Sequence, residues 1–386
     1  MCGIIGVYHP GQASGVSEQA VRRMLSSMVH RGPDGQGLFQ DGSVFIGHRR
    51  LSIIDLASGS QPMSNEDRTI HVCANGEIFN YRELMVELAG QGHRFRTSCD
   101  IEVILHLYER YGIEMFAHME GQFAFALWDT VRRRLVLARD RFGIAPLYYA
   151  THGDALVFAS EIKAMLPVLG RLRLSPEGMA QVFTFWSAVA PRTVFEGIWQ
   201  LRPGQCMVFE EGRRRPFLYW DVSFPPRGAH DIQEEAQAMK GLHEILDEAA
   251  SLRLRSDVPV GAYLSGGLDS SVISVLVKTY VPGMETFSVS FADPAFDESL
   301  FQEAMGRSLG THHHVRRVSY NDICGVFEQV VWHAETPVLR TAPAPMFLLS
   351  RLTRENGVKV VLTGEGADEL FGGYDIFKEA LIRRFW

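Results

Sequence analysis

A cysteine stands directly after the initiator methionine, where removal of the methionine would leave a thiol and a free α-amine on one residue. An α-amine has a pKa of roughly 8, so it can act as a general base near neutral pH, and a thiolate attacks carbonyl carbon. Taken alone, Cys2 would be an incidental small residue. The other four cysteines form no C-x-x-C pair, which disfavours a disulfide framework or a zinc site, and we expect them to be buried apolar residues: Cys73, Cys99, Cys206 and Cys324.

Several motifs after Cys2 carry further polar residues. Individually they have ordinary explanations, because Asn75-Gly76 is a good turn pair, Arg50 could be a surface cation and Asp100 a helix cap. The motifs are M-C-G-I-I-G-V at the start, H-R-G-P-D at 30–34, R-L-S-I-I-D at 50–55, N-G-E-I-F-N-Y at 75–81, D-R-F-G-I-A-P-L-Y-Y at 140–149 and F-A-S-E-I-K at 158–163. Together they resemble the N-terminal-nucleophile glutamine amidotransferases, and specifically the glutamine-hydrolysing asparagine synthetases. Relatives often carry lysine in place of Ala145, which affects no assigned role.

This resemblance implies a glutamine site with Cys2 as the nucleophile. The side-chain amide of Asn75 and the backbone N–H of Gly76 would stabilise the tetrahedral oxyanion. Arg50 would clamp the glutamine carboxylate with its two-donor fork, and Glu77 and Asp100 would hold the ammonium group. The implied glutamine-binding residues are Arg50, Ile53, Asn75, Gly76, Glu77 and Asp100.

A glycine-rich loop in the second half, S-G-G-L-D-S-S at 265–271, follows an apolar strand and opens a helix. Such a loop can present N–H groups and a helix dipole to phosphate, although a generic Ser-Gly turn is the alternative. It lacks the lysine of a Walker A loop and resembles the pyrophosphate loop of ATP pyrophosphatases. A second motif, T-G-E-G-A-D-E-L-F-G-G-Y at 363–374, begins with Thr363 where the family usually has serine.

The resemblance assigns ATP and Mg²⁺ as cofactors of this half. Asp269 and Asp368 would hold Mg²⁺ and Glu365 would contact the adenylated intermediate, whereas the plainer alternative has Asp368 and Glu369 capping a helix. Arg340 is a candidate contact for an acidic acceptor. The implied ATP-binding residues are Leu264, Ser265, Gly266, Gly267, Asp269, Ser270, Val289, Thr363 and Gly364.

The elements that must position these residues divide into two patterns. Residues 1–222 show short strands interrupted by a few helices, and the resemblance implies an α+β domain, the αββα sandwich of Ntn hydrolases. Residues 223–386 follow a Pro/Gly-rich stretch, begin with a helix at about 234–254 and then alternate strand with helix. That alternation predicts an α/β domain with a parallel sheet and ligands at the carboxyl ends of its strands, of the ATP-pyrophosphatase (adenine nucleotide alpha hydrolase-like) type.

Two local patterns carry more specific expectations. Asn80 with Glu83 three residues later predicts a capped helix start. The adjacent histidines His312, His313 and His314 would alternate faces on a strand, so we do not expect a metal site there.

Composition and charge limit the classes of partner that we expect for this chain. The chain of 386 residues has a formal net charge of −7, and the arginine runs at 132–134 and 213–215 are expected to be solvated loop charges, so we expect no nucleic-acid or membrane partner. No apolar stretch approaches the roughly 20 residues of a membrane-spanning helix. We therefore expect a cytoplasmic protein with small-molecule substrates, for which a homodimer is one assembly to consider.

The predicted reaction joins both halves: ATP, L-aspartate, L-glutamine and water give AMP, diphosphate, L-asparagine and L-glutamate through an acyl adenylate and channelled ammonia. One alternative keeps the chemistry but amidates another carboxylate, on a cell wall or exopolysaccharide. The other is a shortened, non-catalytic glutamine- or ATP-binding protein. The resemblance covers the whole chain, but relatives continue past the position of Trp386 into a helical region with a lysine thought to aid adenylation, so the synthetase site is expected to be incomplete here.

Overall fold

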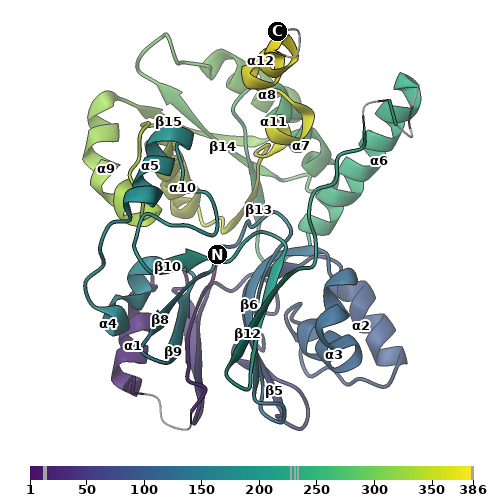
Figure 1. Cartoon of the computed structure of the whole chain (residues 1–386). Coiled ribbons are helices and arrows are strands. Elements are labelled where there is room, and N and C mark those ends of the chain that lie inside the picture. Colours follow the sequence, from purple (N-terminus) through teal and green to yellow (C-terminus); the bar gives the residue numbers. More distant parts are fainter. Residues whose placement is uncertain (12–14, 227, 230–231, 233, 384–386) are drawn as a thin grey trace. The chain divides into compact units, whose positions relative to one another are not determined.

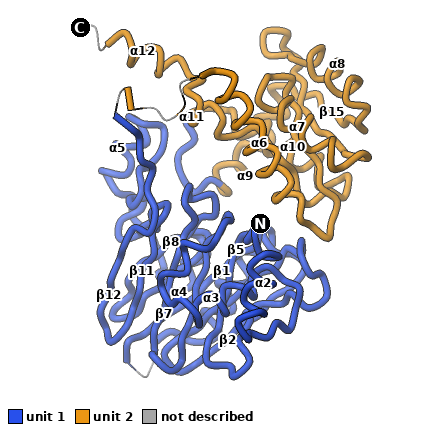
Figure 2. The backbone as a smooth tube through the Cα atoms, turned by 90° about the vertical axis from the view of Figure 1, so that its right-hand side faces the viewer, with its two compact units in different colours: residues 1–226, 334–339 blue, residues 227–333, 340–386 orange. Residues whose placement is uncertain are grey.

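The computed structural model describes residues 1–11, 15–226, 228–229, 232 and 234–383. The chain forms two compact units (Figure 2). The first comprises Met1–Pro226 together with Ala334–Leu339, and the second comprises Arg227–His333 together with Arg340–Trp386. A short segment late in the sequence thus packs with the first unit.

The first unit contains two six-stranded sheets whose paired strands are antiparallel. One has the order β10-β8-β9-β1-β3-β2, and the other β12-β11-β7-β6-β5-β4. The strands of the first sheet are β1 (Gly3–Tyr8), β2 (Gly35–Asp41), β3 (Val44–Arg50), β8 (Tyr148–His152), β9 (Ala155–Ala159) and β10 (Ile198–Gln200). Those of the second are β4 (Met63–Ser64), β5 (Ile70–Ile78), β6 (Gly121–Asp129), β7 (Arg134–Arg139), β11 (Gln205–Glu210) and β12 (Arg213–Leu218).

The period-two alternation of strand β1 shows how the layers form. Ile4 and Tyr8 enter the core shared by the two sheets, which also contains Trp128 of β6. Ile5 and Val7 point to the opposite face and pack with helix α1. Helices α2 and α3 cover the outer face of the other sheet (Figure 1). The predicted αββα sandwich is therefore confirmed.

The helices of the first unit follow the apolar periodicity of the sequence. Their bounds are α1 (Glu18–Ser26), α2 (Tyr81–Gly90), α3 (Glu102–Tyr111), the 3₁₀ helices η1 (Gly112–Ala117) and η2 (Ile162–Met165), α4 (Leu166–Leu169) and α5 (Pro176–Phe185). The start of α2 is where Asn80 predicted it, but the expected side-chain cap is wrong. The Asn80 amide instead donates to His118 O (2.9 Å) and accepts from Glu120 N–H (3.0 Å), because a distant loop lies beside it.

Two further expectations about local structure are wrong. Arg213–Arg215 lie on strand β12 rather than in a loop, although they are exposed as expected; β12 is an edge strand, where charged residues discourage further pairing. Cys324 is exposed on helix α9, whereas Cys73, Cys99 and Cys206 are buried as predicted.

The second unit has a four-stranded parallel sheet of order β15-β14-β13-β16. Val277 of α7 packs on one face with Leu254, which follows α6, and Leu349 of α10 packs on the other with Phe287. The predicted α/β domain is confirmed. Its elements are α6 (Glu235–Arg253), β13 (Val260–Tyr263), α7 (Leu268–Tyr280), β14 (Glu285–Phe291), α8 (Ser299–Leu309), β15 (His312–Val318), α9 (Tyr320–Ala334), α10 (Pro343–Glu355), β16 (Val360–Leu362), α11 (Ala367–Phe371) and α12 (Asp375–Arg383).

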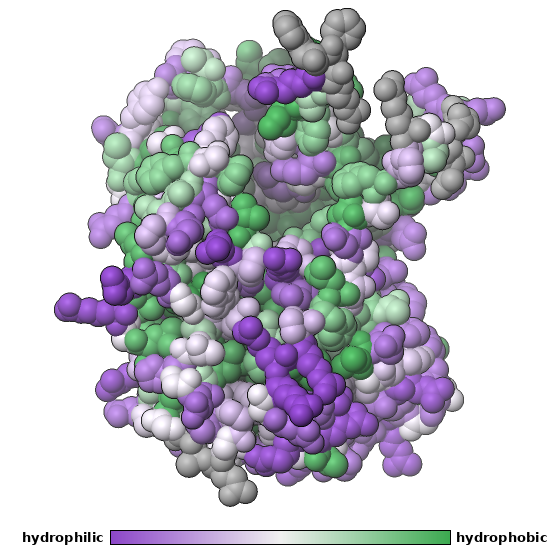
Figure 3. All heavy atoms as spheres, viewed as in Figure 1, coloured by the Kyte–Doolittle hydropathy of each residue, from purple (hydrophilic) through white to green (hydrophobic). Residues whose placement is uncertain are grey.

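The surface seen in Figure 3 intersperses hydrophobic with hydrophilic residues. Within the described ranges, no helix combines the length and the apolar character that crossing a membrane requires. The three histidines of β15 do not converge: His313 bonds Thr286 Oγ1 (2.9 Å) and His314 pairs with Glu285.

Candidate active sites

A small pocket in the first unit contains the cysteine at position 2. The Leu51 N–H donates a hydrogen bond to Cys2 Sγ (3.3 Å), and Arg31 Nε donates to Cys2 O (2.7 Å). Burial raises the pKa of the Cys2 thiol, and the Leu51 hydrogen bond lowers it in part. The pocket is lined by Met1, Cys2, Arg50, Leu51, Ile53, Ile54, Gly59, Gln61, Gly76, Glu77, Cys99, Asp100, Ile101 and Gln122. The structure thus gathers six of the sequence-derived residues around one space.

Strand β5 presents an open edge to this pocket. Thr130 N–H donates to Thr69 O, and Phe79 N–H donates to Glu120 O. In this antiparallel register the backbone N–H and C=O groups of the odd-numbered residues of β5 bond to β6, whereas those of the even-numbered residues point to the other edge of β5. Strand β4 covers that second edge only opposite His71 and Val72. The N–H of Gly76 therefore lies on an edge without a neighbouring strand, beside the pocket.

The backbone at Gly76 has no room for a side chain. Its φ is +137°, and a Cβ there would lie 1.9 Å from Gln122 O. The preceding Asn75 is fully buried, and among the described residues neither its Oδ1 nor its Nδ2 has a hydrogen-bond partner. Asn75 is not among the residues that line the pocket, but it directly precedes Gly76, which is. An unsatisfied buried amide is costly, so this side chain calls for a polar partner.

Two carboxyl groups share the pocket. Burial, with the nearby charge of Asp100, raises the pKa of Glu77 to about 7. Burial likewise raises the pKa of Asp100 to about 6, although its Oδ2 accepts a hydrogen bond from Ile78 N–H (2.9 Å). A bound cation would stabilise the ionised form of both groups.

Arg50 belongs to the pocket wall, but its donors are partly used by the protein. Its Nη1 donates to Leu56 O (3.3 Å), and its Nη2 donates to Ile54 O (3.3 Å) and to the neighbouring Asp55 O. Gly59 leaves space for the guanidinium, because a Cβ there would lie 2.4 Å from Nη2. The loop therefore fixes the cation in place, while Ile53 supplies apolar wall beside it.

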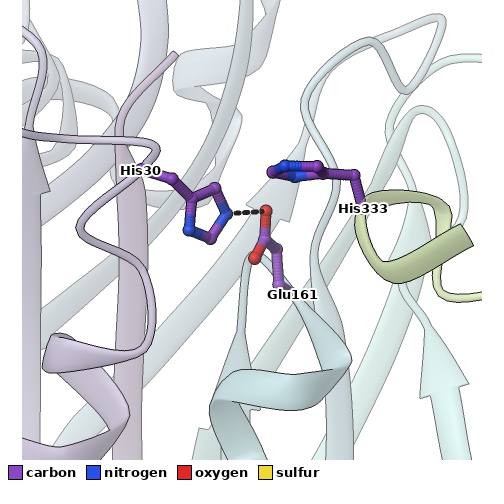
Figure 4. Close-up of side chains that lie close together, drawn as sticks. All are labelled: His30, Glu161 and His333. Atoms are coloured by element: carbon purple, nitrogen blue, oxygen red, sulfur yellow. Dashed lines mark hydrogen bonds and ion pairs between the residues drawn. The ribbon is translucent and has the colours of Figure 1, made fainter. Parts of the chain in front are cut away.

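An ion-pair network behind Cys2 was not assigned a role from the sequence. Glu161 Oε1 accepts from His30 Nε2 (3.0 Å; Figure 4). The same oxygen accepts from Arg31 Nη1 (3.2 Å), and Oε2 pairs with Lys163 Nζ (2.9 Å). Burial alone would raise the pKa of Glu161, but His30, Lys163 and Arg31 together lower it to about 2. Glu335 extends the network by accepting from the N–H groups of Ile162 (2.7 Å) and Lys163 (2.6 Å). The network fixes Arg31, which holds the Cys2 carbonyl.

A cluster of two histidines joins His93, in the segment before α3, to His106 and Glu109 of α3. Glu109 Oε2 accepts from His106 Nδ1 (2.9 Å) and His93 Nδ1 (3.0 Å). Burial alone would lower the pKa of His106, but the carboxylate of Glu102, 3.9 Å from Nε2, and the hydrogen-bonded Glu109 raise it to about 9. A charged imidazole between two carboxylates accounts for this group.

A larger pocket in the second unit lies where the strands of the parallel sheet end. Most sequence-derived nucleotide residues line it: Leu264, Ser265, Asp269, Ser270, Val289, Thr363, Gly364 and the neighbouring Glu365 and Asp368. Gly266 and Gly267 are not among the lining residues. Gly266 has φ +85° and lies against Phe301, while Gly267 is the N-cap of α7. Lining residues that the sequence did not reveal include Tyr263, Phe287, Gln302, Met346 and Tyr374.

The two glycine-rich motifs meet in this pocket. A Cβ on Gly364 would lie 2.8 Å from Ser270 N and 3.0 Å from Asp269 Cβ, so only glycine permits the approach. Ser265 Oγ and Ser270 Oγ are 2.8 Å apart, and Ser265 Oγ also accepts from Gly267 N–H (3.2 Å). The loop is therefore ordered by its own serines at the start of α7.

Carboxylates border the same pocket and suit a hard cation. Asp269 and Asp368 line it with Glu298, Glu365 and Glu369, an all-oxygen donor set of the kind Mg²⁺ prefers. Asp368 lies inside α11, whose N-cap position is Gly366 and has no side-chain cap, so the helix-cap explanation fails. Arg340 is exposed and is not among the described residues that line the pocket.

Comparisons with known proteins agree with this division. Residues 1–220 match the glutamine amidotransferase domain family and residues 241–386 match the asparagine synthase family. The chain is 37% identical over 385 residues to asparagine synthetase [glutamine-hydrolyzing] 1 of Bacillus subtilis, covering 99% of this chain and 60% of that protein. It is 36% identical over 407 residues to amidase chry2 of Gibberella zeae, covering 98% and 60%. The chain thus spans about 60% of the length of these relatives.

A solved structure also resembles the chain at low identity. Glutamine phosphoribosylpyrophosphate amidotransferase from B. subtilis aligns at 16% identity with a TM-score of 0.44, covering 94% of this chain and 90% of that one.

Proposed function

The chain belongs to the glutamine amidotransferase domain family, with an asparagine synthase domain after the first domain, and we propose that its first unit hydrolyses glutamine through Cys2. The observation that carries the proposal is the fully buried Asn75 amide without a partner, next to an unpaired strand edge at Gly76. Both groups are donors suited to a tetrahedral oxyanion. Gly76 lines the same pocket as Cys2, and Asn75 directly precedes Gly76 on β5.

In the proposed reaction, Cys2 Sγ attacks the side-chain amide carbon of glutamine. The carbonyl oxygen becomes an oxyanion held by Asn75 Nδ2 and Gly76 N–H, and collapse releases ammonia and leaves a thioester. Water then hydrolyses the thioester to glutamate and restores the thiol. The α-amine of Cys2, after removal of Met1, would accept and return the proton. An active preparation whose intact mass retained Met1 would contradict that role for the amine.

The second unit would use ATP to activate a carboxylate for the ammonia. We propose aspartate as the acceptor, which gives asparagine, AMP and diphosphate with channelled ammonia. Asp269 and Asp368 would hold Mg²⁺, which would neutralise charge on the phosphates when bound. The remaining residues of the pocket bind and orient the nucleotide, with Ser265, Ser270 and Gly364 at the phosphate side and Glu365 near the adenylated intermediate.

The test measures both half-reactions with the protein as its gene encodes it. Purified protein should release glutamate and ammonia from glutamine, and should form diphosphate and AMP when ATP, Mg²⁺, aspartate and a nitrogen donor are supplied. If glutamine were not hydrolysed, the proposal for the first unit would fail.

A different carboxylate is the second candidate acceptor, because a relative of nearly the same identity, 36% against 37%, is named an amidase. The motifs at the reactive centres do not separate the two cases. Diphosphate release measured across a panel of carboxylates distinguishes them. Turnover with aspartate far below that with another acid would replace the acceptor while leaving the glutaminase proposal in place.

Glutamine binding should weaken as the solution becomes acidic. Glu77 and Asp100 hold the ammonium only when ionised, and their raised pKa values of about 7 and 6 mean that they take up protons below neutral pH. The KM for glutamine should therefore rise about tenfold between pH 8 and pH 6. A KM that stays constant to pH 6 would contradict this assignment, and Glu77→Gln should raise KM throughout and flatten the profile.

Alanine at Gly364 should weaken nucleotide binding selectively. The added Cβ would lie 2.8 Å from Ser270 N and displace the loop at residues 265–271, so we expect the ATP dissociation constant to rise at least about tenfold. Calorimetric titration of ATP measures this, with the glutaminase rate as an internal reference. Gly283→Ala is the matched control, because nothing lies within 4 Å of a Cβ there. Unchanged ATP affinity in Gly364→Ala would show that the loop does not bind phosphate.

A further inference from the structure

The peptide groups of Ala74, the residue before Asn75, are held by two side chains instead of a strand. Ala74 N–H donates to Gln61 Oε1 (2.6 Å), and His48 Nε2 donates to Ala74 O (3.0 Å). Both groups of Ala74 point to the second edge of β5, which β4 no longer covers at this position. Two side chains therefore replace the missing ladder bonds immediately ahead of the oxyanion donors.

His48 reaches Ala74 from the other sheet. It lies on β3, is completely buried, and burial lowers its pKa to about 3, so the ring is neutral at physiological pH. Because a carbonyl oxygen only accepts, the proton must be on Nε2. Within the described residues Nδ1 has no partner, a cost that an apolar side chain would avoid. The hydrogen bond to Ala74 is thus the one polar contact that explains a histidine here.

Gln61 reaches the same edge of β5 from the segment before β4. It precedes β4, lines the pocket of Cys2 and is buried. Its Oε1 takes the Ala74 N–H, while Asp100 takes the N–H of Ile78 on the same edge. Gly76 lies between these two bonded residues, and in the register of β5 its N–H points to the same edge.

We propose that His48 and Gln61 are positioning residues that clamp the Ala74 peptide and so aim the Asn75 amide and the Gly76 N–H at the oxyanion. This inference rests on the proposed glutamine hydrolysis. The Asn75 side chain has no partner of its own among the described residues, so its direction is set by the backbone that carries it. Gly76 lies against Gln122 of β6 at one edge of β5. At the other edge His48 and Gln61 hold the Ala74 peptide.

The kinetic test compares variants that keep or remove the donor. His48→Phe keeps an aromatic ring but has no N–H, whereas His48→Gln offers an amide N–H at a similar reach. A misplacement of about 1 Å can cost about 10²-fold in rate. We expect His48→Phe and Gln61→Met to lower kcat for glutamine hydrolysis about 10- to 100-fold with KM within about twofold, and His48→Gln to remain within about threefold of the parent.

A transition-state mimic separates positioning from general damage. Glutamate γ-semialdehyde forms a tetrahedral adduct with a cysteine thiol, so its affinity should fall in His48→Phe by the same factor as kcat, while affinity for glutamate should not change. His71→Phe is the matched control, because it removes another bond from a histidine Nε2 to a backbone carbonyl: His71 lies on β5 and bonds Arg68 O (2.9 Å), and neither residue lines the pocket. It should leave kcat unchanged.

Amide hydrogen exchange tests the clamp without any catalysis. Exchange of the peptide covering Ala74–Gly76 should quicken in His48→Phe and in Gln61→Met and stay slow in His48→Gln. If the parent protein does not hydrolyse glutamine, the proposed function fails while this measurement still decides the clamp. Equal exchange in all variants, or equal loss of kcat in His48→Phe and His48→Gln, would overturn the proposal.

Discussion

Replacing Cys2 by alanine should lower glutamine hydrolysis by at least about 10³-fold, while glutamine still binds. Cys2 Sγ accepts a hydrogen bond from the backbone N–H of Leu51 (3.3 Å), whereas Cys99, the other thiol that lines the pocket, donates to Asp100 Oδ1 (3.5 Å). The groups assigned to the substrate's charged ends, Arg50, Glu77 and Asp100, are untouched by the change. The Cys2→Ala protein should therefore still bind glutamine, as calorimetry measures, but should lose turnover, as glutamate release measures.

Two comparisons make this result specific. Cys324→Ala removes an exposed thiol in the second unit and should leave hydrolysis unchanged. Diphosphate formation by Cys2→Ala supplied with ammonium salts in place of glutamine should equal that of the parent protein. If Cys2→Ala kept more than a tenth of the parent's glutamine hydrolysis, Cys2 would not be the nucleophile.

The elements that local periodicity defines could be predicted from the sequence. The helix expected at about 234–254 is α6 (Glu235–Arg253), whose ends lie within one residue of the expected ones because its own apolar pattern encodes it. The loop at 265–271 was identifiable for the same reason, since a strand before it and a helix after it define its geometry.

Contacts between distant residues could not be predicted. The bond from His48 to Ala74 links strands of two different sheets, and Glu335 reaches Ile162 across 173 positions. Asn80 was expected to cap its own helix and instead bonds the chain near residue 120, because tertiary contacts decided its partner. Arg50 is similar: the family resemblance implied a carboxylate clamp, but the carbonyls of residues 54–56 that hold it are set by the fold of a loop.

A second large loss of glutamine hydrolysis should follow from replacing Gly76 by alanine. A Cβ there would lie 1.9 Å from Gln122 O and 2.6 Å from Phe123 Cα, both backbone atoms of β6 that cannot turn away. The φ of +137° adds strain of about 1–3 kcal/mol for any residue with a side chain. Strand β5 must therefore move away from β6, and the Gly76 N–H and the Asn75 amide must move with it.

We expect Gly76→Ala to lower kcat for glutamine hydrolysis about 10²- to 10³-fold, as the loss of one oxyanion donor does, and to lower the melting temperature of the first unit. Gly90→Ala is the matched control: Gly90 ends helix α2 with nothing within 4 Å of a Cβ, so alanine there should keep activity and the melting temperature. ATP binding by the second unit reports whether Gly76→Ala damages only the glutaminase. A Gly76→Ala protein with parental kcat would show that β5 does not supply the oxyanion donors, because no backbone movement could make room for that Cβ without displacing them.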